Sequence, residues 1–376
     1  MRTPDAAELL AAINRWVAIE SKSDDLAGVT AMIDAAAAAF AAAGMAVERI
    51  AGRDGFGDHL RAGAPWGGAH PESSPGVLVL CHLDTVHPRG TLAANPIRTE
   101  GDRAYGPGIC DMKGGVVIAL AAAGSLIGTG RVTPLPLRFL VTSDEEVGSP
   151  TSRALIEAEG ARAKYVLVVE PAREGGKCVT ARKGTGRMTV TAHGVPAHSG
   201  LHHRDGASAI LEIARQVVAL EAMTDYARGL TVNVGLIRGG TGVNVVPEHC
   251  AVEVDLRMVT PEDGEAAAAR VRGLTPRDPR VRLEVSGGLN RPPYRKSAEI
   301  TALYGRARGL AAEIGFELGD TFTGGGSDGN FTAALAPTLD GLGVDGAGAH
   351  TLGEHLLVSS LVPRMTLLRR LFETLD

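Results

Sequence analysis

Continuous apolar runs alternate with segments of helical periodicity in the first half of the chain. Three runs are strongly apolar, which is typical of parallel strands buried on both faces. They are VLVLCH (77–82), LRFLVTSDEE (137–146) and YVLVVEP (165–171). DMKGGVVIALAAAGSLIG (111–128) separates the first two runs and is long enough to form a crossover helix. The pattern predicts an α/β sheet covered by helices.

The pattern changes near residue 184. A strand, a helix, two strands, a helix and a strand are expected in turn. They cover RMTVTAH (187–193), GASAILEIARQVVALEAM (206–223), LTVNVGLIRGG (230–240), CAVEVDLRMV (250–259), PEDGEAAAARVRGL (261–274) and VRLEVSGG (281–288). This βαββαβ order is that of a ferredoxin-like α+β unit. Helical and Gly-rich patterns then return, so we predict a domain at 184–290 inserted between two segments of the first domain, 1–183 and 291–376.

Length, charge and cysteine usage narrow the function classes. A chain of 376 residues is longer than one hydrophobic core usually organises, which agrees with two domains. The formal net charge is −5, whereas nucleic-acid-binding domains carry basic patches. No secretory signal is recognisable, the four cysteines lack CxxC spacing, and no apolar run approaches the roughly 18 to 20 residues of a membrane span. We expect a cytoplasmic protein with reduced cysteines that binds neither nucleic acid nor membranes.

Polar residues stand where the predicted parallel strands end, which is where α/β sheets bind ligands. His82 ends the first run and Asp84 follows two residues later, so their side chains face the same way. A metal-bound histidine commonly donates its second N–H to a carboxylate, but a buried histidine with a satisfied hydrogen bond has the same His-x-Asp pattern. Acidic residues also stand at the start of the crossover helix and at the ends of the second and third runs: Asp111, then Glu145 and Glu146, then Glu170.

These acidic groups would repel one another if they met in a buried place without a counter-charge. A solvated acidic rim explains any one of them, whereas divalent cations explain the whole set. Imidazole and carboxylate ligands suit zinc, with cobalt or manganese as alternatives. Two ions bridged by one carboxylate can clamp a water molecule and polarise a carbonyl group. One further carboxylate must stay free to take a proton, and the adjacent Glu145 and Glu146 are suited to divide these tasks.

Seven motifs extend this pattern over nearly the whole chain. In order, they are HLDTV, YGPGICDMKGG, DEEVGS, VVEP, VPAHSG, GGGSDGNF and GEHLLVSS. With this ordered set the chain resembles the M20 family of di-zinc peptidases and deacylases. The resemblance implies an α/β catalytic domain with two Zn²⁺ per subunit and an inserted ferredoxin-like domain that acts as a lid and mediates dimerisation. The expected assembly is a homodimer.

The resemblance also implies residue roles. One zinc ion would be bound by His82, Asp111 and Glu170, and the other by the bridging Asp111, Glu146 and His355. Glu145 would be the general base, and Asp84 would orient His82. His198, in VPAHSG, would reach the active site of the partner subunit and stabilise the oxyanion, although a histidine in a surface turn has the same local pattern.

Within the family, the block TLAANPIRTEGDRAYGPGICDMKGG (91–115) makes the chain most similar to the glutamate carboxypeptidases. Basic and amide groups would then hold the carboxylates of a C-terminal glutamate, because arginine binds carboxylates in bidentate fashion. The matching positions are Lys177, Asn244, Arg257 and Arg291, with Gly325 and Gly326 letting the backbone approach the substrate closely.

Two of these positions have a second explanation, and a third matches only through a gap. Lys177 matches only with a one-residue deletion in the loop after Glu170. Asn244 is also suited to a turn before Pro247, and Arg257 shares a strand face with Glu253 and Asp255 and is suited to pair with them.

The implied function is zinc-dependent hydrolysis of the amide bond of a C-terminal glutamate or of an N-acyl amino acid. The substrate would be a small molecule or short peptide with a free carboxylate. One alternative is a deacylase or desuccinylase of the acetylornithine deacetylase or succinyl-diaminopimelate desuccinylase type. Another is a non-catalytic amino-acid or peptide binding protein on a hydrolase scaffold, although the presence of every expected ligand and of the base argues against it.

Overall fold

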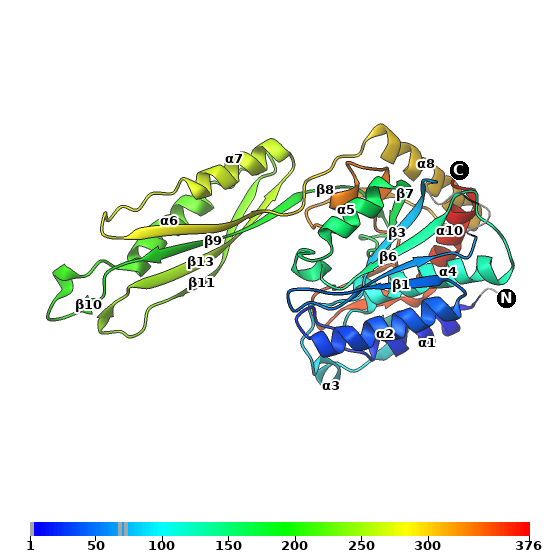
Figure 1. Ribbon diagram of the computed structural model, residues 1–376, viewed down its shortest axis with the longest axis horizontal. Helices are drawn as coiled ribbons and strands as arrows, with labels where there is room; N and C mark the ends of the chain where they lie inside the picture. The colour runs from blue at the N-terminus through cyan, green and yellow to red at the C-terminus, as the bar shows by residue number, and fades with distance from the viewer. Residues whose placement is uncertain (1–3, 67–69, 71–73) are drawn as a thin grey trace. The chain divides into compact units, whose positions relative to one another are not determined.

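The chain divides into two units, one of which is inserted into the other (Figure 1). The computed structural model describes residues 4–66, 70 and 74–376, so residues 1–3, 67–69 and 71–73 of the predicted first segment lie outside the described residues. The first unit consists of Met1–Ala181, Arg295–Phe322 and Ser327–Asp376, and the second of Arg182–Tyr294 and Thr323–Gly326.

The main segment of the second unit, 182–294, is a few residues longer at each end than the predicted insertion, 184–290, and the unit has one further part that the sequence does not reveal. It also takes in the short segment 323–326, which the sequence assigns to the first domain. The backbone N–H of Lys183 donates to the carbonyl of Thr323 (3.0 Å). Arg182 donates from Nη1 to the carbonyls of Gly325 (3.0 Å) and Gly326 (3.2 Å). These bonds attach the Gly-rich segment to the inserted unit.

A six-stranded sheet forms the centre of the first unit. Its order is β1 (Ala46–Ile50), β2 (His59–Gly63), β6 (Leu137–Thr142), β3 (Gly76–His82), β7 (Ala163–Val168) and β16 (Thr338–Leu339). β3 runs parallel to β6 and to β7, and all seven of its residues are buried. This confirms the prediction of parallel strands buried on both faces, and it brings the carboxyl ends of the three strands to one edge.

Helices cover both faces of this sheet. Val77 and Val79 of β3 pack into the larger core with α1 (Ala6–Val17), α2 (Leu26–Ala42), α4 (Gly114–Gly128), α8 (Ala298–Ile314) and α10 (Leu361–Thr374). Leu78 and Leu80 face the other way, toward α5 (Arg153–Ala161) and α9 (Gly329–Thr332). Successive strand residues point to opposite faces, so the apolar residues of β3 contribute in turn to the two cores and the strand is held from both sides.

Two smaller sheets and a short helix accompany the central sheet. α3 (Thr91–Ala94) precedes a four-stranded sheet of β17 (Gly346–Ala347), β18 (His355–Leu357), β5 (Arg103–Tyr105) and β4 (Arg98–Glu100). β8 (Cys178–Arg182) pairs with β15 (Asp320–Thr323). By length and composition alone, the continuous helical segment Ile109–Gly128 is apolar enough to cross a membrane, but 83% of that window is buried inside the structure. It packs as a core helix of the first unit.

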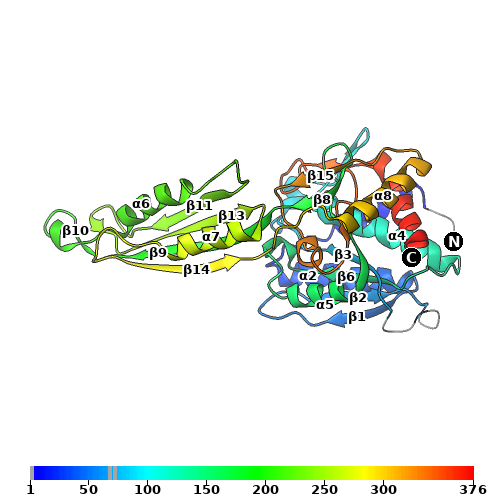
Figure 2. The same cartoon turned by 90° about the horizontal axis from the view of Figure 1, so that it is seen from above.

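The second unit is an antiparallel sheet with two helices on one face. The strand order is β11 (Thr231–Gly239), β13 (His249–Met258), β9 (Gly184–His193) and β14 (Arg282–Leu289). Figure 2 shows α6 (Ala209–Glu221) and α7 (Pro261–Arg272) lying along these strands, and their apolar side chains share one core with them. This confirms the predicted βαββαβ unit. Beyond β9, a two-stranded ladder joins β10 (Ala197–His198) to β12 (Val245–Val246).

Candidate metal centre

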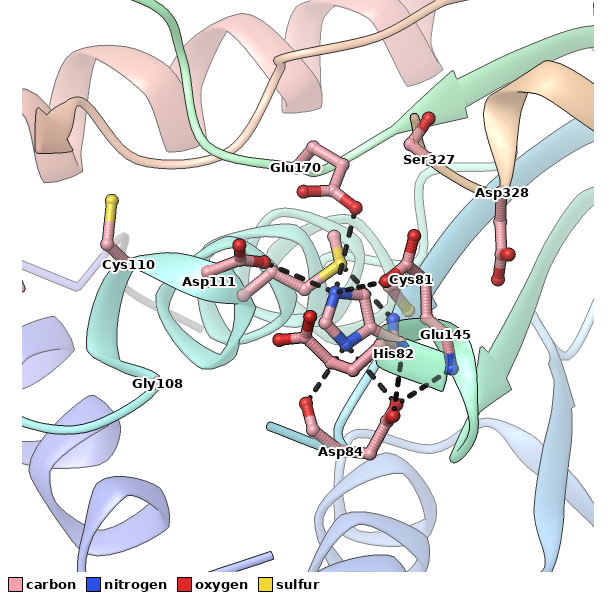
Figure 3. Close-up of polar contacts among 12 residues, drawn as sticks. Cys81, His82, Asp84, Gly108, Cys110, Asp111, Glu145, Glu170, Ser327 and Asp328 are labelled. Atoms are coloured by element: carbon pink, nitrogen blue, oxygen red, sulfur yellow. Dashed lines mark hydrogen bonds and ion pairs between the residues drawn. The ribbon is translucent and has the colours of Figure 1, made fainter. Parts of the chain in front are cut away.

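His82 stands at the carboxyl end of β3 and is 1% exposed. Its Nε2 atom lies 3.2 Å from Oδ1 of Asp111 and 3.6 Å from Oε1 of Glu170 (Figure 3). Glu170 follows β7, and Asp111 lies in the turn Ile109–Lys113, just before α4 begins at Gly114. Three segments that are distant in the sequence therefore bring one imidazole and two carboxylates together.

A second histidine faces the same aspartate from the other side. Nε2 of His350 lies 3.4 Å from Oδ2 of Asp111 and 3.2 Å from Oε2 of Glu146. Glu146 belongs to the short 3₁₀ turn Glu145–Val147 that follows β6. The two oxygens of Asp111 thus point toward two different histidines, and each histidine has at least one further carboxylate beside it. This is the arrangement that a carboxylate shared by two cations requires.

The second histidine is not the one that the sequence predicts. His355 is the first residue of β18, where it pairs with Tyr105 of β5. Its ring centroid lies 5.2 Å from that of Tyr105, and its Nδ1 is 2.9 Å from the carbonyl oxygen of Gly353. His350 instead lies in a turn and has a left-handed backbone with φ of 67°, a strained conformation that clusters at functional sites. The structure therefore replaces His355 by His350 beside Asp111 and Glu146.

Asp84 connects both sides of the cluster. It is fully buried, and its carboxylate accepts hydrogen bonds from the backbone N–H groups of Glu145 (3.2 Å) and Glu146 (3.1 Å) and from the hydroxyl of Ser23 (2.7 Å). Nδ1 of His82 is 3.0 Å from the Asp84 carbonyl oxygen and 3.4 Å from Oδ1. With its proton on Nδ1, His82 presents the lone pair of Nε2 to the carboxylates.

Burial and mutual repulsion shift the acid–base equilibria of the cluster. Burial, together with the negative charge of Asp111, raises the pKa of Glu146 to about 8 even though His350 opposes the shift. Burial and then Asp111 also raise the pKa of Glu170. Contacts with Asp111 and Glu146 raise the pKa of His350 to about 11. The carboxylates thus compete for positive charge, which a metal ion supplies.

Donor chemistry and unsatisfied atoms both fit a metal ion. His82, Asp111 and Glu146 offer ligand atoms within 4.8 Å of one another, as do His82, Glu145 and Glu170. Nε2 of His82, Oδ1 of Asp111 and Oε1 of Glu146 are buried and make no hydrogen bond within the described part of the chain. Buried polar atoms are normally satisfied, and metal ions bound in this cluster would satisfy all three.

Two of the predicted substrate-site residues lie together at one end of the inserted unit. His198 is exposed, and its Nδ1 accepts hydrogen bonds from the backbone N–H groups of Gly200 (3.1 Å) and Leu201 (3.2 Å). The carbonyl oxygen of Asn244 accepts from the backbone N–H of Ser199 (3.0 Å), so Asn244 borders the His198 turn. Because Nδ1 accepts, the proton of a neutral His198 ring is on Nε2.

The predicted arginines lie at the other end of the same unit. Arg257 donates from Nε (2.7 Å) and Nη2 (3.0 Å) to the two oxygens of Asp255, so its fork binds a carboxylate of its own strand. Arg291 is 6% exposed and donates to Oδ1 of Asn290 (3.3 Å). A side chain at Gly326 would begin 2.9 Å from Cδ of Arg291, so only glycine fits there without rearrangement.

Arg182 and Lys177 complete the comparison with the sequence. The carbonyls of Gly325 and Gly326 accept from Arg182, which is fully buried and which sequence reasoning missed. An arginine in a strand carries no local signal of such a partner. Lys177 lies in the first unit, is exposed, and extends its aliphatic chain over Gly319.

Comparison with known proteins agrees with this architecture. Residues 78–374 match peptidase family M20/M25/M40. Carboxypeptidase G2 from Pseudomonas sp. (strain RS-16) is 32% identical over 301 residues, which cover 78% of this chain and 72% of that protein. A succinyl-diaminopimelate desuccinylase from Cupriavidus taiwanensis is 28% identical over 295 residues, covering 74% of this chain and 76% of that protein.

A solved structure shows that the likeness extends to the whole fold. The aminopeptidase PepT from Bacillus cereus ATCC 10987 superimposes with a TM-score of 0.75 and covers 99% of each chain, at 22% identity. The chain therefore belongs to peptidase family M20/M25/M40, a family of metal-dependent peptidases and amidohydrolases.

Proposed function

We propose that this protein is a two-metal hydrolase that cleaves the amide bond before a C-terminal glutamate, as its sequence resemblance to the glutamate carboxypeptidases implies; its relative carboxypeptidase G2 is a carboxypeptidase by name. The observation that carries the proposal is the position of Asp111, whose two oxygens face His82 at 3.2 Å and His350 at 3.4 Å. We expect two Zn²⁺ per subunit, with Co²⁺ or Mn²⁺ as alternatives, because imidazole and carboxylate donors suit these ions.

The ligands fall into two sets that share one residue. His82, Asp111 and Glu170 would hold one ion, and His350, Asp111 and Glu146 the other. When bound, two divalent cations polarise a scissile carbonyl group and lower the pKa of the attacking water.

Glu145 is the residue we assign to proton transfer. Its Oε2 is 4.0 Å from Nε2 of His82, farther than the nearest oxygens of Asp111 and Glu170, and Figure 3 shows its side chain beside this cluster. Its backbone N–H is fixed by Asp84. Glu145 would take a proton from the attacking water and return it to the leaving nitrogen.

A homodimer is supported by the distribution of predicted substrate-site residues along the insertion. Thr185 of β9 is the register partner of Arg257 and donates to the Arg291 carbonyl, whereas His198 lies beyond the other end of that strand. Eight residue-to-residue steps lead from Thr185 to His193, or about 26 Å at about 3.3 Å each. A site that uses both the two arginines and His198 therefore needs two copies of the chain.

The exposed residues of the inserted unit offer a surface for such pairing. β11 is an edge strand, and its Leu236 and Ile237 are 47% and 57% exposed. On α6, Leu211 and Val218 are 52% and 72% exposed. Exposed apolar residues on an edge strand favour association with another chain. In that dimer, Nε2–H of His198 would donate to the substrate oxygen that gains negative charge.

A deacylase or desuccinylase is the second candidate, and Arg257 is the observation that favours it. Its guanidinium is bound by Asp255, so recognition of a glutamate side chain would require this pair to open or to act through the remaining Nη1. N-succinyl-diaminopimelate and N-acetylornithine would then be better substrates than N-acyl-glutamates.

The test is a metal analysis followed by a substrate panel. Purified protein should contain two metal ions per subunit, and a chelator should abolish hydrolysis. Preference for N-acyl-glutamates supports the first candidate, and preference for the other two substrates supports the second. Protein that neither holds nor takes up a metal ion would contradict both.

A cytoplasmic location also remains our proposal. It is supported by the four cysteines, all of which are buried and free, as is usual for proteins of reducing compartments.

A further inference from the structure

Glu354 is a buried carboxylate outside the two ligand sets, and it is 1% exposed. It lies between His350 and β18. Its Oε1 accepts hydrogen bonds from the backbone N–H groups of Cys110 and Asp111, both at 2.9 Å. Its Oε2 accepts from the backbone N–H of Gly108 (2.9 Å) and lies 2.7 Å from Nε2 of His87.

These contacts make Glu354 the point around which the Asp111 turn is formed. Three backbone N–H groups of Gly108–Asp111 converge on one carboxylate, a concave arrangement that suits a fixed negative charge. Gly108 has φ of 69°, which allows the turn to curve around Glu354. One of the donors is the N–H of Asp111 itself, so the carboxylate acts on this residue without any intermediate.

Glu354 also lies four residues after His350, the histidine that faces Oδ2 of Asp111. The loop that carries His350 is therefore attached directly to the loop that carries Asp111. Without this bond, the 3.4 Å separation between Nε2 of His350 and Oδ2 of Asp111 would depend on two independent loops.

We propose that Glu354 is a positioning residue for the second metal ion: it holds Asp111 and His350 at the separation at which both can bind that ion. This inference rests on the proposed two-metal function. The first ion depends less on Glu354, because His82 is the last residue of β3 and Glu170 follows β7, both strands of the central sheet. Loss of Glu354 should therefore weaken one ion selectively.

Glu354→Gln tests the proposal with little change in shape. The amide oxygen can still accept from Cys110 and Asp111, but an NH₂ group would then face the N–H of Gly108, and two donors cannot bond to each other. Glu212→Gln is the matched control. Glu212 is also 1% exposed and accepts from the backbone N–H of Arg277 (3.2 Å), but it belongs to α6 of the inserted unit.

Zinc binding is measured by equilibrium dialysis over a range of free Zn²⁺, and the Co²⁺ forms are compared by absorption spectroscopy. Wild type and Glu212→Gln should bind two ions. Glu354→Gln should bind one ion normally and the other about 10 to 100 times more weakly, the loss typical of an outer residue that orients a ligand. Its kcat should recover as free metal rises.

Different results point to different errors. If wild type binds no metal, the proposed function fails. If wild type binds two ions and Glu354→Gln binds both with unchanged affinity, the positioning role alone is overturned. Should Glu354→Gln not fold, His87→Phe removes one donor and keeps a ring in place. It should weaken the same ion to a smaller degree, and unchanged binding there would equally overturn the proposal.

Discussion

Exchanging His350 for alanine tests the centre most directly, with His355→Ala as its control. The two histidines are five residues apart in the chain, His350 in a loop and His355 at the start of β18, and of the two only His350 contacts Asp111 and Glu146. His355 contacts Tyr105 and the Gly353 carbonyl instead. The pair therefore separates the loss of a ligand from the disturbance of the loop.

The size of the effect follows from the ligand count. Without His350 the second ion keeps Asp111 and Glu146, two of the three side chains in its set. Losing a residue that only orients a ligand weakens metal binding by about 10 to 100-fold, so losing a ligand should weaken it by at least about 100-fold. At 1.4 kcal/mol for each factor of ten, this is at least about 2.8 kcal/mol. The His350 side chain is 54% exposed, so water can replace it and the protein should still fold.

Equilibrium dialysis with zinc, the Co²⁺ absorption spectrum and hydrolysis of the preferred substrate measure the outcome. His350→Ala should retain one tightly bound ion and lose most of its activity at low free metal. His355→Ala should retain two ions, with activity within a few-fold of wild type. The reverse result, with one ion lost in His355→Ala and two retained in His350→Ala, would refute the assignment made from these distances.

Three further outcomes are expected. Glu145→Gln should keep both metal ions and lower kcat by about 10² to 10⁴-fold, the usual contribution of a general acid–base group; near-normal turnover would exclude Glu145 as the base. Glu145→Gln and His198→Ala subunits, each inactive alone, should recover roughly a quarter of wild-type activity when they are mixed by refolding. Half of the dimers then contain one subunit of each kind, and each such dimer has one complete site out of two. No recovery would argue against a site shared between subunits. Burial lowers the pKa of His59 despite the opposing charges of Asp144, Asp84, Asp328 and Asp58. Below about pH 6.5 the unfolded chain therefore binds more protons than the folded protein, and the free energy of unfolding decreases as the pH is lowered. Metal-free His59→Gln should lose less in melting temperature than metal-free wild type between pH 7.5 and pH 5.5, and equal losses would contradict this.

The sequence predicts the parts of the fold that depend on local pattern. The apolar run that becomes β3 shows a strand buried on both faces, and the alternation in β9 and β13 shows strands with one buried face. The strand pattern also predicts that His82 and Glu170 lie at one edge, because parallel strands end at the same side of a sheet.

Contacts between distant residues account for what the sequence does not predict. His350 and His355 lie only five residues apart in the sequence. Which of them faces Asp111 depends on the pairing of β18 with Tyr105 and on the left-handed backbone of His350. The sequence leaves the partner of Arg257 open for a different reason, because the nearby Asp255 and a substrate carboxylate satisfy the same guanidinium fork.

The segment 323–326 has a practical consequence for anyone who wishes to study the insertion in isolation. A gene fragment encoding 182–294 would omit Gly325 and Gly326, whose carbonyls accept from the fully buried Arg182. The fragment would then leave a guanidinium without two of its native acceptors, at a penalty of roughly 1 to 3 kcal/mol or more. A usable fragment should graft the tetrapeptide back through a short linker, or replace Arg182 with an apolar residue of similar length.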